Sequence, residues 1–464
     1  MPADFFYALL PEQLLLALLV TLMLCEILGR GARLAGPLFT LVAGAGCAVL
    51  LLQLAQGYGA APVPGEIVID RFALLGRLVI LGCGCIYGVC CLSSDAGIKS
   101  RLLLGASLLG ALVMLDSAGF ISLFLGIELL SLPAFALMVH RCGLSSASEG
   151  AFKYLLLSAV ASGLILFGLS LGYGSCGTLA IGDFVAATAD GPLGLAACAL
   201  VLSGFFLKAA VFPFHGWAPD AYAGARLPVT ALLASIVKGA VVLALVRILG
   251  EAPLPSELDG AIIVLAVLSI FYGNVTAIRQ GAFRRLLAYS SIAHGGYMIF
   301  ALADAGGGRV EALLYYVAVY AVTTIVACTC FGLLAQGEAD ELEVLDGAFA
   351  ARPLPALLLA VSVLSLAGIP PLPGFLAKFF IFKSVIASGH LVPAVLAFAG
   401  SYLGVVYYLG IVYRLFRPAT APARPARPAL PAARWAFGGM LLGSAVLMLF
   451  MVAPGVFHRL LGGL

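Results

Sequence analysis

Long apolar stretches set the strongest constraint on how this chain can fold. Only 10% of its 464 residues are charged and 63% are hydrophobic, whereas soluble domains carry about 25% charged residues. An apolar stretch of about 20 residues can cross a bilayer as an α-helix. The sequence predicts about fourteen such spans, near residues 9–29, 34–56, 72–93, 99–115, 117–139, 151–174, 193–214, 227–249, 260–278, 284–303, 311–335, 354–387, 391–414 and 435–456. We therefore predict an all-α integral membrane protein.

The loops between these spans differ strongly in charge. When alternate loops are counted together, fifteen basic residues fall on one side of the membrane and four on the other. Because loops rich in Lys and Arg stay in the cytoplasm, the more basic side is assigned to the cytoplasm. An even number of spans then places both termini outside the cytoplasm, which is the periplasm in a bacterium.

Four lysines are set within apolar surroundings: Lys153, Lys208, Lys238 and Lys378. A charged side chain at the bilayer centre costs roughly 2.5 to 3.5 kcal/mol on insertion scales, so each needs a partner, water or a functional reason. The one clearly central carboxylate, Glu128, cannot neutralise four ammonium groups. Burial favours the neutral amine, whereas a nearby carboxylate favours the ammonium form. A lysine held between these influences can exchange a proton.

Prolines interrupt two of the spans that carry these lysines. Lys208 lies five residues before Pro213, and Lys378 lies five residues after Pro373. The second interruption contains two more prolines, Pro370 and Pro371. Proline frees backbone carbonyls that lipid cannot satisfy, so a break is tolerated only where protein or water covers it. The alternative, that the prolines are simple kinks and the lysines snorkel or face other subunits, is weaker for two such sites than for one.

The two broken helices would be the seventh and the twelfth spans. This spacing predicts two five-helix repeats, roughly 99–249 and 260–414, and because five is odd the second repeat would be inverted, as is typical of transporters. We divide the chain into an N-terminal three-helix segment (1–95), a first repeat (96–250), a second repeat (251–416), and a Pro/Arg-rich linker with a C-terminal helix (417–464).

The remaining polar residues give weaker signals. His215 and His294 are candidates for proton transfer because imidazole titrates near neutral pH, although a single histidine is as often structural. Arg77 and Lys383 lie where snorkelling to an interface is plausible. The cysteines form no C-x2-C pair with a matching second half. We therefore predict that this chain holds no haem, no iron–sulfur cluster, no flavin and no other metal ion. A net charge of +3 is too small and too scattered to predict nucleic-acid binding.

With these residues assembled, the chain resembles the antiporter-like membrane subunits of respiratory complex I, the bacterial proton-pumping NADH:quinone oxidoreductase. The resemblance runs from about residue 99 to 416. It rests on four stretches in the family's order: "AFKYLLLSAVASGLILFGLSLGYGSCGTL" (151–179), "FPFHGWAPDAYAGARLPVTALLASIVKGA" (212–240), "RRLLAYSSIAHGGYM" (284–298) and "LAGIPPLPGFLAKFFIF" (366–382).

The resemblance implies roles for individual residues. Glu128 resembles the glutamate that pairs with the seventh-helix lysine, here Lys208, and Lys153 resembles a sixth-helix lysine near that pair. Lys238 matches the central lysine that links two half-channels, and Lys378 matches the residue on the exit side. His215 matches the motif histidine that follows the break of the seventh helix. The stretch "GARLP" departs from the family's pattern at Arg226, and the sequence offers no explanation for this difference.

The function implied by the resemblance is proton translocation driven by quinone reduction elsewhere in the complex. Flavin, iron–sulfur clusters and quinone are expected in partner subunits, and the other membrane and peripheral subunits, including further antiporter-like ones, are the expected partners in a bacterial inner membrane. A subunit of a multi-subunit sodium/proton antiporter would share the fold and the lysines. A structural scaffold without its own proton path is another alternative, although a scaffold has no reason to bear the cost of buried lysines.

Overall fold

The computed structural model describes residues 2–91, 97–140, 145–187, 191–250, 254–304, 308–335, 340–418 and 431–452. The first elements are α1 (Pro2–Ala8), α2 (Leu10–Ile27), α3 (Ala35–Ala55), β1 (Ala60–Val63), β2 (Ile67–Ile69) and α4 (Arg71–Cys90). The next are α5 (Gly97–Asp116), α6 (Phe120–Val139), α7 (Ser145–Cys176), α8 (Ile181–Ala187), α9 (Pro192–Lys208), α10 (Ala218–Gly224), α11 (Leu227–Leu232), the π-helix η2 (Leu233–Val237) and α12 (Lys238–Leu249). The last are α13 (Ser256–Ile278), α14 (Phe283–Phe300), the 3-10 helix η3 (Ala301–Ala303), α15 (Arg309–Ala335), the 3-10 helix η4 (Leu342–Leu345), α16 (Ala348–Ala351), α17 (Pro353–Ala367), α18 (Pro373–Ala387), α19 (Leu391–Phe416) and α20 (Pro431–Val452).

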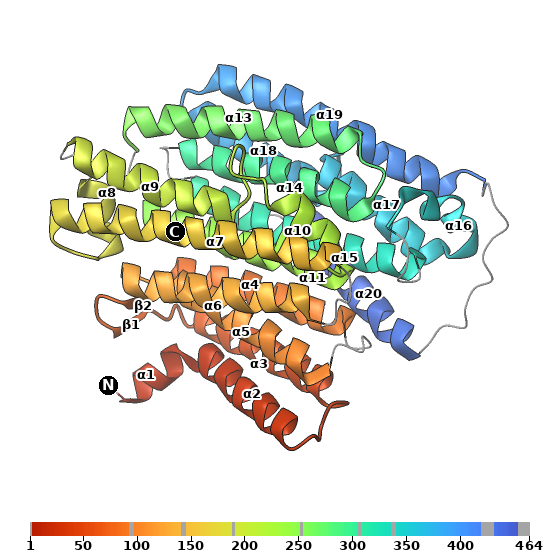
Figure 1. Cartoon of the computed structure of the whole chain (residues 1–464), viewed down its shortest axis with the longest axis horizontal. Helices are drawn as coiled ribbons and strands as arrows, with labels where there is room; N and C mark the ends of the chain where they lie inside the picture. The colour runs from red at the N-terminus through yellow and green to blue at the C-terminus, as the bar shows by residue number, and fades with distance from the viewer. Residues whose placement is uncertain are drawn as a thin grey trace.

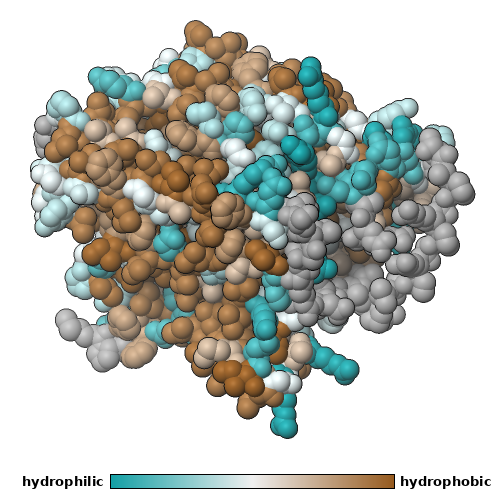
Figure 2. Space-filling view, viewed as in Figure 1, coloured by the Kyte–Doolittle hydropathy of each residue, from teal (hydrophilic) through white to brown (hydrophobic). Residues whose placement is uncertain are grey.

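The predicted helical, multi-pass membrane class is confirmed. Twelve helices or helical runs of the described residues are long and apolar enough to cross a membrane, and the apolar helices α9 and α17 are shorter. Figure 1 shows long helices lying side by side, with α2 and α3 at one edge of the bundle and α13 and α19 at the opposite edge. Apolar side chains cover most of the face seen in Figure 2, as a surface in contact with lipid or with other subunits requires.

One element escaped the sequence analysis, a short hairpin in which β1 pairs antiparallel with β2. Strands of three and four residues are too short to give a clear alternating pattern between two apolar spans. The hairpin is attached to the turn between α5 and α6, because the carbonyl of Glu66 accepts hydrogen bonds from Ala118 N and Ser122 Oγ, both at 2.8 Å.

Two connections contain non-helical backbone that is only partly buried, since Ala209, Ala210 and Val211 are inside the bundle whereas Pro213, Pro370 and Pro371 are exposed. Helix α9 ends at Lys208 and α10 begins at Ala218, while α17 ends at Ala367 and α18 begins at Pro373. The stretch 354–387, predicted as one span, is thus two helices. Gly368 ends α17 in the left-handed conformation, at φ +84°, which glycine adopts without steric cost.

Glycines bring neighbouring helices into backbone contact. A Cβ placed on Gly126 of α6 would lie 2.8 Å from Met114 N of α5, and one placed on Gly273 of α13 would lie 2.6 Å from Ala293 N of α14. In the pair α7 and α9, a Cβ on Gly168 or on Gly204 would lie 2.7 Å from a carbonyl oxygen of the other helix. Small residues at such contacts allow the close van der Waals packing that holds helices together in lipid, where apolar burial gives little driving force.

The interior of the bundle is formed by the run Leu227–Leu249, most of which is buried, and by α14 and α15. The last helix, α20, packs against α4 and α15 and so reaches back to the N-terminal part of the chain. The predicted Pro/Arg-rich linker lies largely outside the described residues.

We predict that Gly273→Ala destabilises the protein by about 1–3 kcal/mol, the usual cost of overpacking, because its methyl group would overlap the backbone of α14. Gly260→Ala is the matched control, since a Cβ there meets no atom within 4 Å on the same helix α13. Thermal unfolding of the detergent-solubilised protein should show a lower midpoint for the first variant only. Equal midpoints would contradict the close contact between α13 and α14.

Candidate functional site

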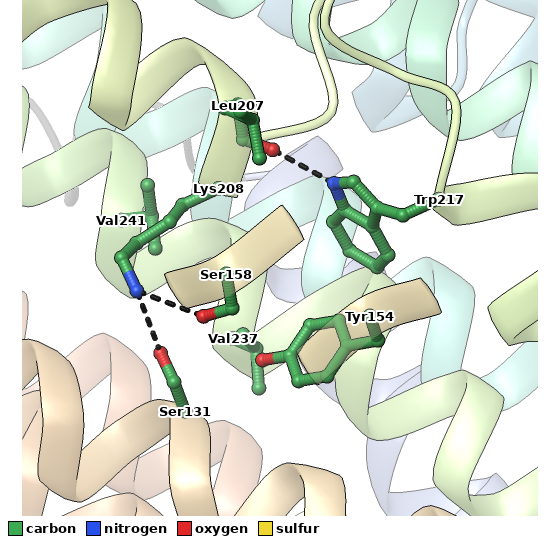
Figure 3. Close-up of a pocket in the computed structure, with 8 residues that line it drawn as sticks. All are labelled: Ser131, Tyr154, Ser158, Leu207, Lys208, Trp217, Val237 and Val241. Carbon is green, nitrogen blue, oxygen red and sulfur yellow. Dashed lines mark hydrogen bonds between the residues drawn. The ribbon is translucent and has the colours of Figure 1, made fainter. Parts of the chain in front are cut away.

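The side chain of Lys208 points into a small cavity at the end of α9 (Figure 3). Its Nζ donates to Ser158 Oγ at 3.0 Å and to Ser131 Oγ at 3.4 Å. Trp217 Nε1 donates to Leu207 O at 2.7 Å and so satisfies one carbonyl released where the helix ends. The cavity has room for about one water molecule and is lined by Ser131, Tyr154, Ser158, Leu207, Lys208, Trp217, Val237 and Val241.

Glu128 of α6 lies beside this lysine, as the sequence predicted. Glu128 Oε1 is 3.5 Å from Lys208 Nζ and accepts a hydrogen bond from Ser162 Oγ at 2.5 Å. The Glu128 side chain is 28% exposed and that of Lys208 only 4%. Since charge-assisted hydrogen bonds normally measure about 2.7–2.9 Å, the pair is an ion pair without a tight hydrogen bond. Its energy therefore depends on small movements of either side chain.

Lys238 begins α12 directly after the π-helical turn η2. Its side chain is almost fully buried, and Nζ donates to Ser291 O of α14 at 2.6 Å. A π-helical turn shifts the register of the residues that follow it and is frequent at functional sites. The sequence carried no signal for this turn, because the run Leu227–Leu249 is apolar on every side of the helix.

His294 lies at the centre of a hydrogen-bonded group of tyrosines. Its Nδ1 is 2.7 Å from Tyr316 Oη, and its Nε2 is 3.3 Å from Tyr408 Oη. Tyr408 Oη in turn shares a hydrogen bond of 2.5 Å with Ser290 Oγ, one turn before His294 on α14. Hydroxyl groups both donate and accept, so this group can pass a proton along α14.

Lys378 of α18 is held against the end of α17. Its Nζ donates to Ala367 O at 2.9 Å and to Ser401 Oγ at 3.0 Å, and lies 4.8 Å from the centre of the Tyr297 ring. Such a position over a ring face suits a cation, and the Lys378 side chain is more than nine-tenths buried. A Cβ on Gly368 would lie 3.2 Å from Nζ, so the left-handed glycine leaves the space that the lysine occupies.

Two predicted residues lie away from these groups. Lys153 is 40% exposed and forms ion pairs with Asp220 at 2.5 Å and Glu149 at 2.7 Å. His215 is half-buried and packs against the rings of Phe212 and Tyr272, at 5.5 and 4.5 Å. Its Nδ1 has no hydrogen-bond partner among the described residues.

The sequence analysis missed the hydroxyl groups that connect the titratable residues. Ser131 and Ser158 reach Lys208, Ser401 reaches Lys378, and Tyr316 and Tyr408 reach His294. These residues come from helices distant in sequence, and serines and tyrosines are common in apolar spans, so only their position in space distinguishes them. Arg77 was also misread, since its side chain is fully buried in an ion-pair cluster rather than reaching an interface.

This arrangement defines a class: multi-pass membrane proteins whose buried titratable side chains lie beside interrupted helices. The family described as NADH:quinone oxidoreductase/Mrp antiporter, TM, matches residues 117–404. The NADH-quinone oxidoreductase subunit N of Pelobacter propionicus is 60% identical over 467 residues, covering 100% of both chains. A chain of respiratory complex I from Thermus thermophilus with bound aureothin has a TM-score of 0.84 at 32% identity, covering 96% of this chain and 97% of that one.

The chain therefore belongs to the NADH-quinone oxidoreductase subunit N family, whose members are antiporter-like membrane subunits of respiratory complex I of the bacterial inner membrane. A chain of the Mrp complex from Dietzia is similar in fold, with a TM-score of 0.88 at 21% identity, covering 99% of this chain and 96% of that one. That likeness shows a shared fold alone, so the predicted membership of complex I is confirmed over the antiporter alternative.

We predict that Gly368→Ala lowers NADH-driven proton pumping by about three- to tenfold per assembled complex, equivalent to about 0.7–1.4 kcal/mol, because its methyl group would press on Lys378. Gly389→Ala is the matched control. Both glycines have a positive φ, so both substitutions cost about 1–3 kcal/mol of backbone strain, but a Cβ on Gly389 meets nothing within 4 Å. Pumping in membrane vesicles, normalised to assembled complex, separates the two; equal losses would point to strain alone.

Proposed function

We propose that this chain translocates protons through Lys208, Lys238 and Lys378, with His294 and bridging water between them. The observation that carries the proposal is that all three lysines are more than nine-tenths buried and that each Nζ contacts serine hydroxyl or backbone carbonyl oxygens. Within the described residues, only Lys208 of the three has a carboxylate within ion-pair distance. Neutral oxygens stabilise an ammonium less than a carboxylate does, so buried amines of this kind can take up and release a proton.

Glu128 sets the proton affinity of Lys208 in this mechanism. At an effective dielectric constant of 20, two unit charges 4 Å apart attract by about 4 kcal/mol, and doubling their separation halves that energy. A movement of a few ångströms therefore changes the proton affinity of the amine by more than tenfold. Ser162 and Ser158 offer each partner a hydrogen-bonding alternative when the pair separates.

The orientation of the chain follows from the loop charges, whereas the direction of transport is implied by the family resemblance. We infer that protons enter from the cytoplasm near Lys208 and leave on the outer side beyond Lys378, with both termini outside. The partly exposed pair of Lys153 and Asp220 would form part of the cytoplasmic opening. His215 would exchange protons with water near the break between α9 and α10. This orientation rests on the basic cytoplasmic loops and on the family resemblance.

We further propose about fourteen spans in two inverted five-helix repeats, bounded at 96–250 and 251–416, between the N-terminal segment 1–95 and the linker and final helix 417–464. Two features support the repeats. The pairs α5/α6 and α13/α14, each the first two helices of a half, are both in glycine-mediated backbone contact. The interruptions between α9 and α10 and between α17 and α18 occupy the fourth position of each half.

The redox reaction belongs to other subunits in this proposal. Flavin, iron–sulfur clusters and quinone would be bound by partner chains, and this chain would respond to quinone reduction through electrostatic and conformational coupling. Its partners would be the other membrane subunits, including further antiporter-like ones, together with the peripheral subunits and membrane lipid.

We predict that Lys208→Ala and Glu128→Ala each lower proton pumping by about tenfold or more, which corresponds to about 1.4 kcal/mol or more, because they remove the proton-carrying amine or the carboxylate that tunes it. Lys383→Ala, at an exposed position of α18, is the control and should pump normally. Pumping would be measured in vesicles as NADH-driven acidification, with assembly verified on native gels. Normal pumping in both assembled variants would overturn the proposed path and favour a scaffold role.

A further inference from the structure

A second cluster of buried charges lies outside the lysine path, between the N-terminal helices and α5. Arg77 of α4 is fully buried and lies 3.0 Å from Glu12 Oε1 of α2 and 3.2 Å from Asp116 Oδ1 of α5. The side chains of Glu12 and Asp116 are only 10% and 1% exposed. Arg77 Nη1 also approaches the carbonyl of Ala8 at 3.4 Å. One guanidinium is thus shared by two carboxyl groups in the interior of a membrane protein.

The charges of this cluster do not balance if both carboxyl groups are ionised. One Arg and two carboxylates would leave a net charge of −1 away from water, which is costly without compensation. The next charged neighbours, Asp70 and Arg247, already form an ion pair with each other. They therefore add no net positive charge that could compensate for a second carboxylate.

Both carboxyl groups meet at one nitrogen of the guanidinium. Arg77 Nη1 donates to Glu12 Oε1 at 3.0 Å and to Asp116 Oδ2 at 3.3 Å, so the two acids lie close together. Two carboxyl groups that share a site cannot readily ionise together, because the like charges repel at short distance. Glu12 Oε2 and Asp116 Oδ1 accept no well-oriented hydrogen bond within the described part of the chain, as expected where a proton or water is shared.

Further polar groups lie near the cluster on two sides. Gln53 of α3, whose Nε2 donates to Tyr7 O at 2.6 Å, has a buried amide oxygen without a partner among the described residues. On the other side, Arg247 donates to Ser117 O at 2.9 Å, next to Asp116, and pairs with Asp70, whose side chain is 43% exposed. The partly exposed Asp70 is thus connected through Arg247 to the residue that follows Asp116. Arg247 is also in the last turn of α12, the helix that Lys238 begins.

We propose that Glu12 and Asp116 share one exchangeable proton beside Arg77, which makes this cluster a second buried acid–base site in the chain. The proton passes to and from water, and its loss leaves two carboxylates facing one guanidinium. This inference does not depend on the lysine path, and the site has a different chemistry, because its carrier is a carboxylic acid pair instead of an amine.

The test is infrared difference spectroscopy of the assembled complex, which resolves the carbonyl stretch of protonated carboxylic acids and its shift in heavy water. Glu12→Gln and Asp116→Asn should each remove the same single band, because the remaining carboxyl then ionises beside Arg77. Glu26→Gln, which removes an exposed carboxylate of the same helix α2 that is paired with Lys99, should leave the band in place. Native gels would verify assembly of every variant.

The conservative variants Glu12→Asp and Asp116→Glu keep both carboxyl groups and should shift the band without removing it. They also serve where an amide variant fails to assemble. A spectrum unchanged by either pair of substitutions would overturn the proposal, since both carboxyl groups would then be ionised. Loss of two different bands would also overturn it, because each group would then carry its own proton.

Discussion

The cost of placing charge and unsatisfied backbone in hydrocarbon governs this structure. Lys208 and Lys378 lie where a helix is interrupted, so the same protein interior that covers the free carbonyls also supplies oxygen ligands to the amines. Ala367 O, released where α17 ends, accepts a hydrogen bond from Lys378. A helix break leaves carbonyl oxygens without donors, and a buried lysine needs oxygen acceptors. Each therefore supplies the hydrogen-bonding partner that the other would lack in lipid.

The rest of the bundle keeps this interior closed. Glycines bring paired helices into backbone contact, and the largely buried run Leu227–Leu249 places Lys238 in the interior. Arg247 near the end of that run pairs with Asp70, the N-cap of α4, which is the helix of Arg77. An ion pair thus joins the N-terminal helices to the helix of the central lysine.

Similarity in fold and identity in sequence give different information about this chain. The chain of the Mrp complex from Dietzia matches this fold at a TM-score of 0.88 with 21% identity, whereas 60% identity to a subunit N along the whole chain shows the family. A similar bundle can occur in different membrane complexes, so the architecture alone does not decide which complex a chain joins.

The sequence by itself determined the membrane class, most of the helix positions and the isolated charges within apolar spans, because apolar length and isolated charges are properties of single segments. The pair of Glu128 with Lys208 was implied by the family resemblance, and the structure places the two side chains 3.5 Å apart. Only the tertiary structure revealed the serine and tyrosine ligands and placed Lys153 in an exposed ion pair. It also showed that Arg77, predicted to reach an interface, lies at the centre of a buried cluster. The reason is physical: the environment of a charge depends on neighbours from distant helices, and a linear pattern records which residues are polar but not which of them meet.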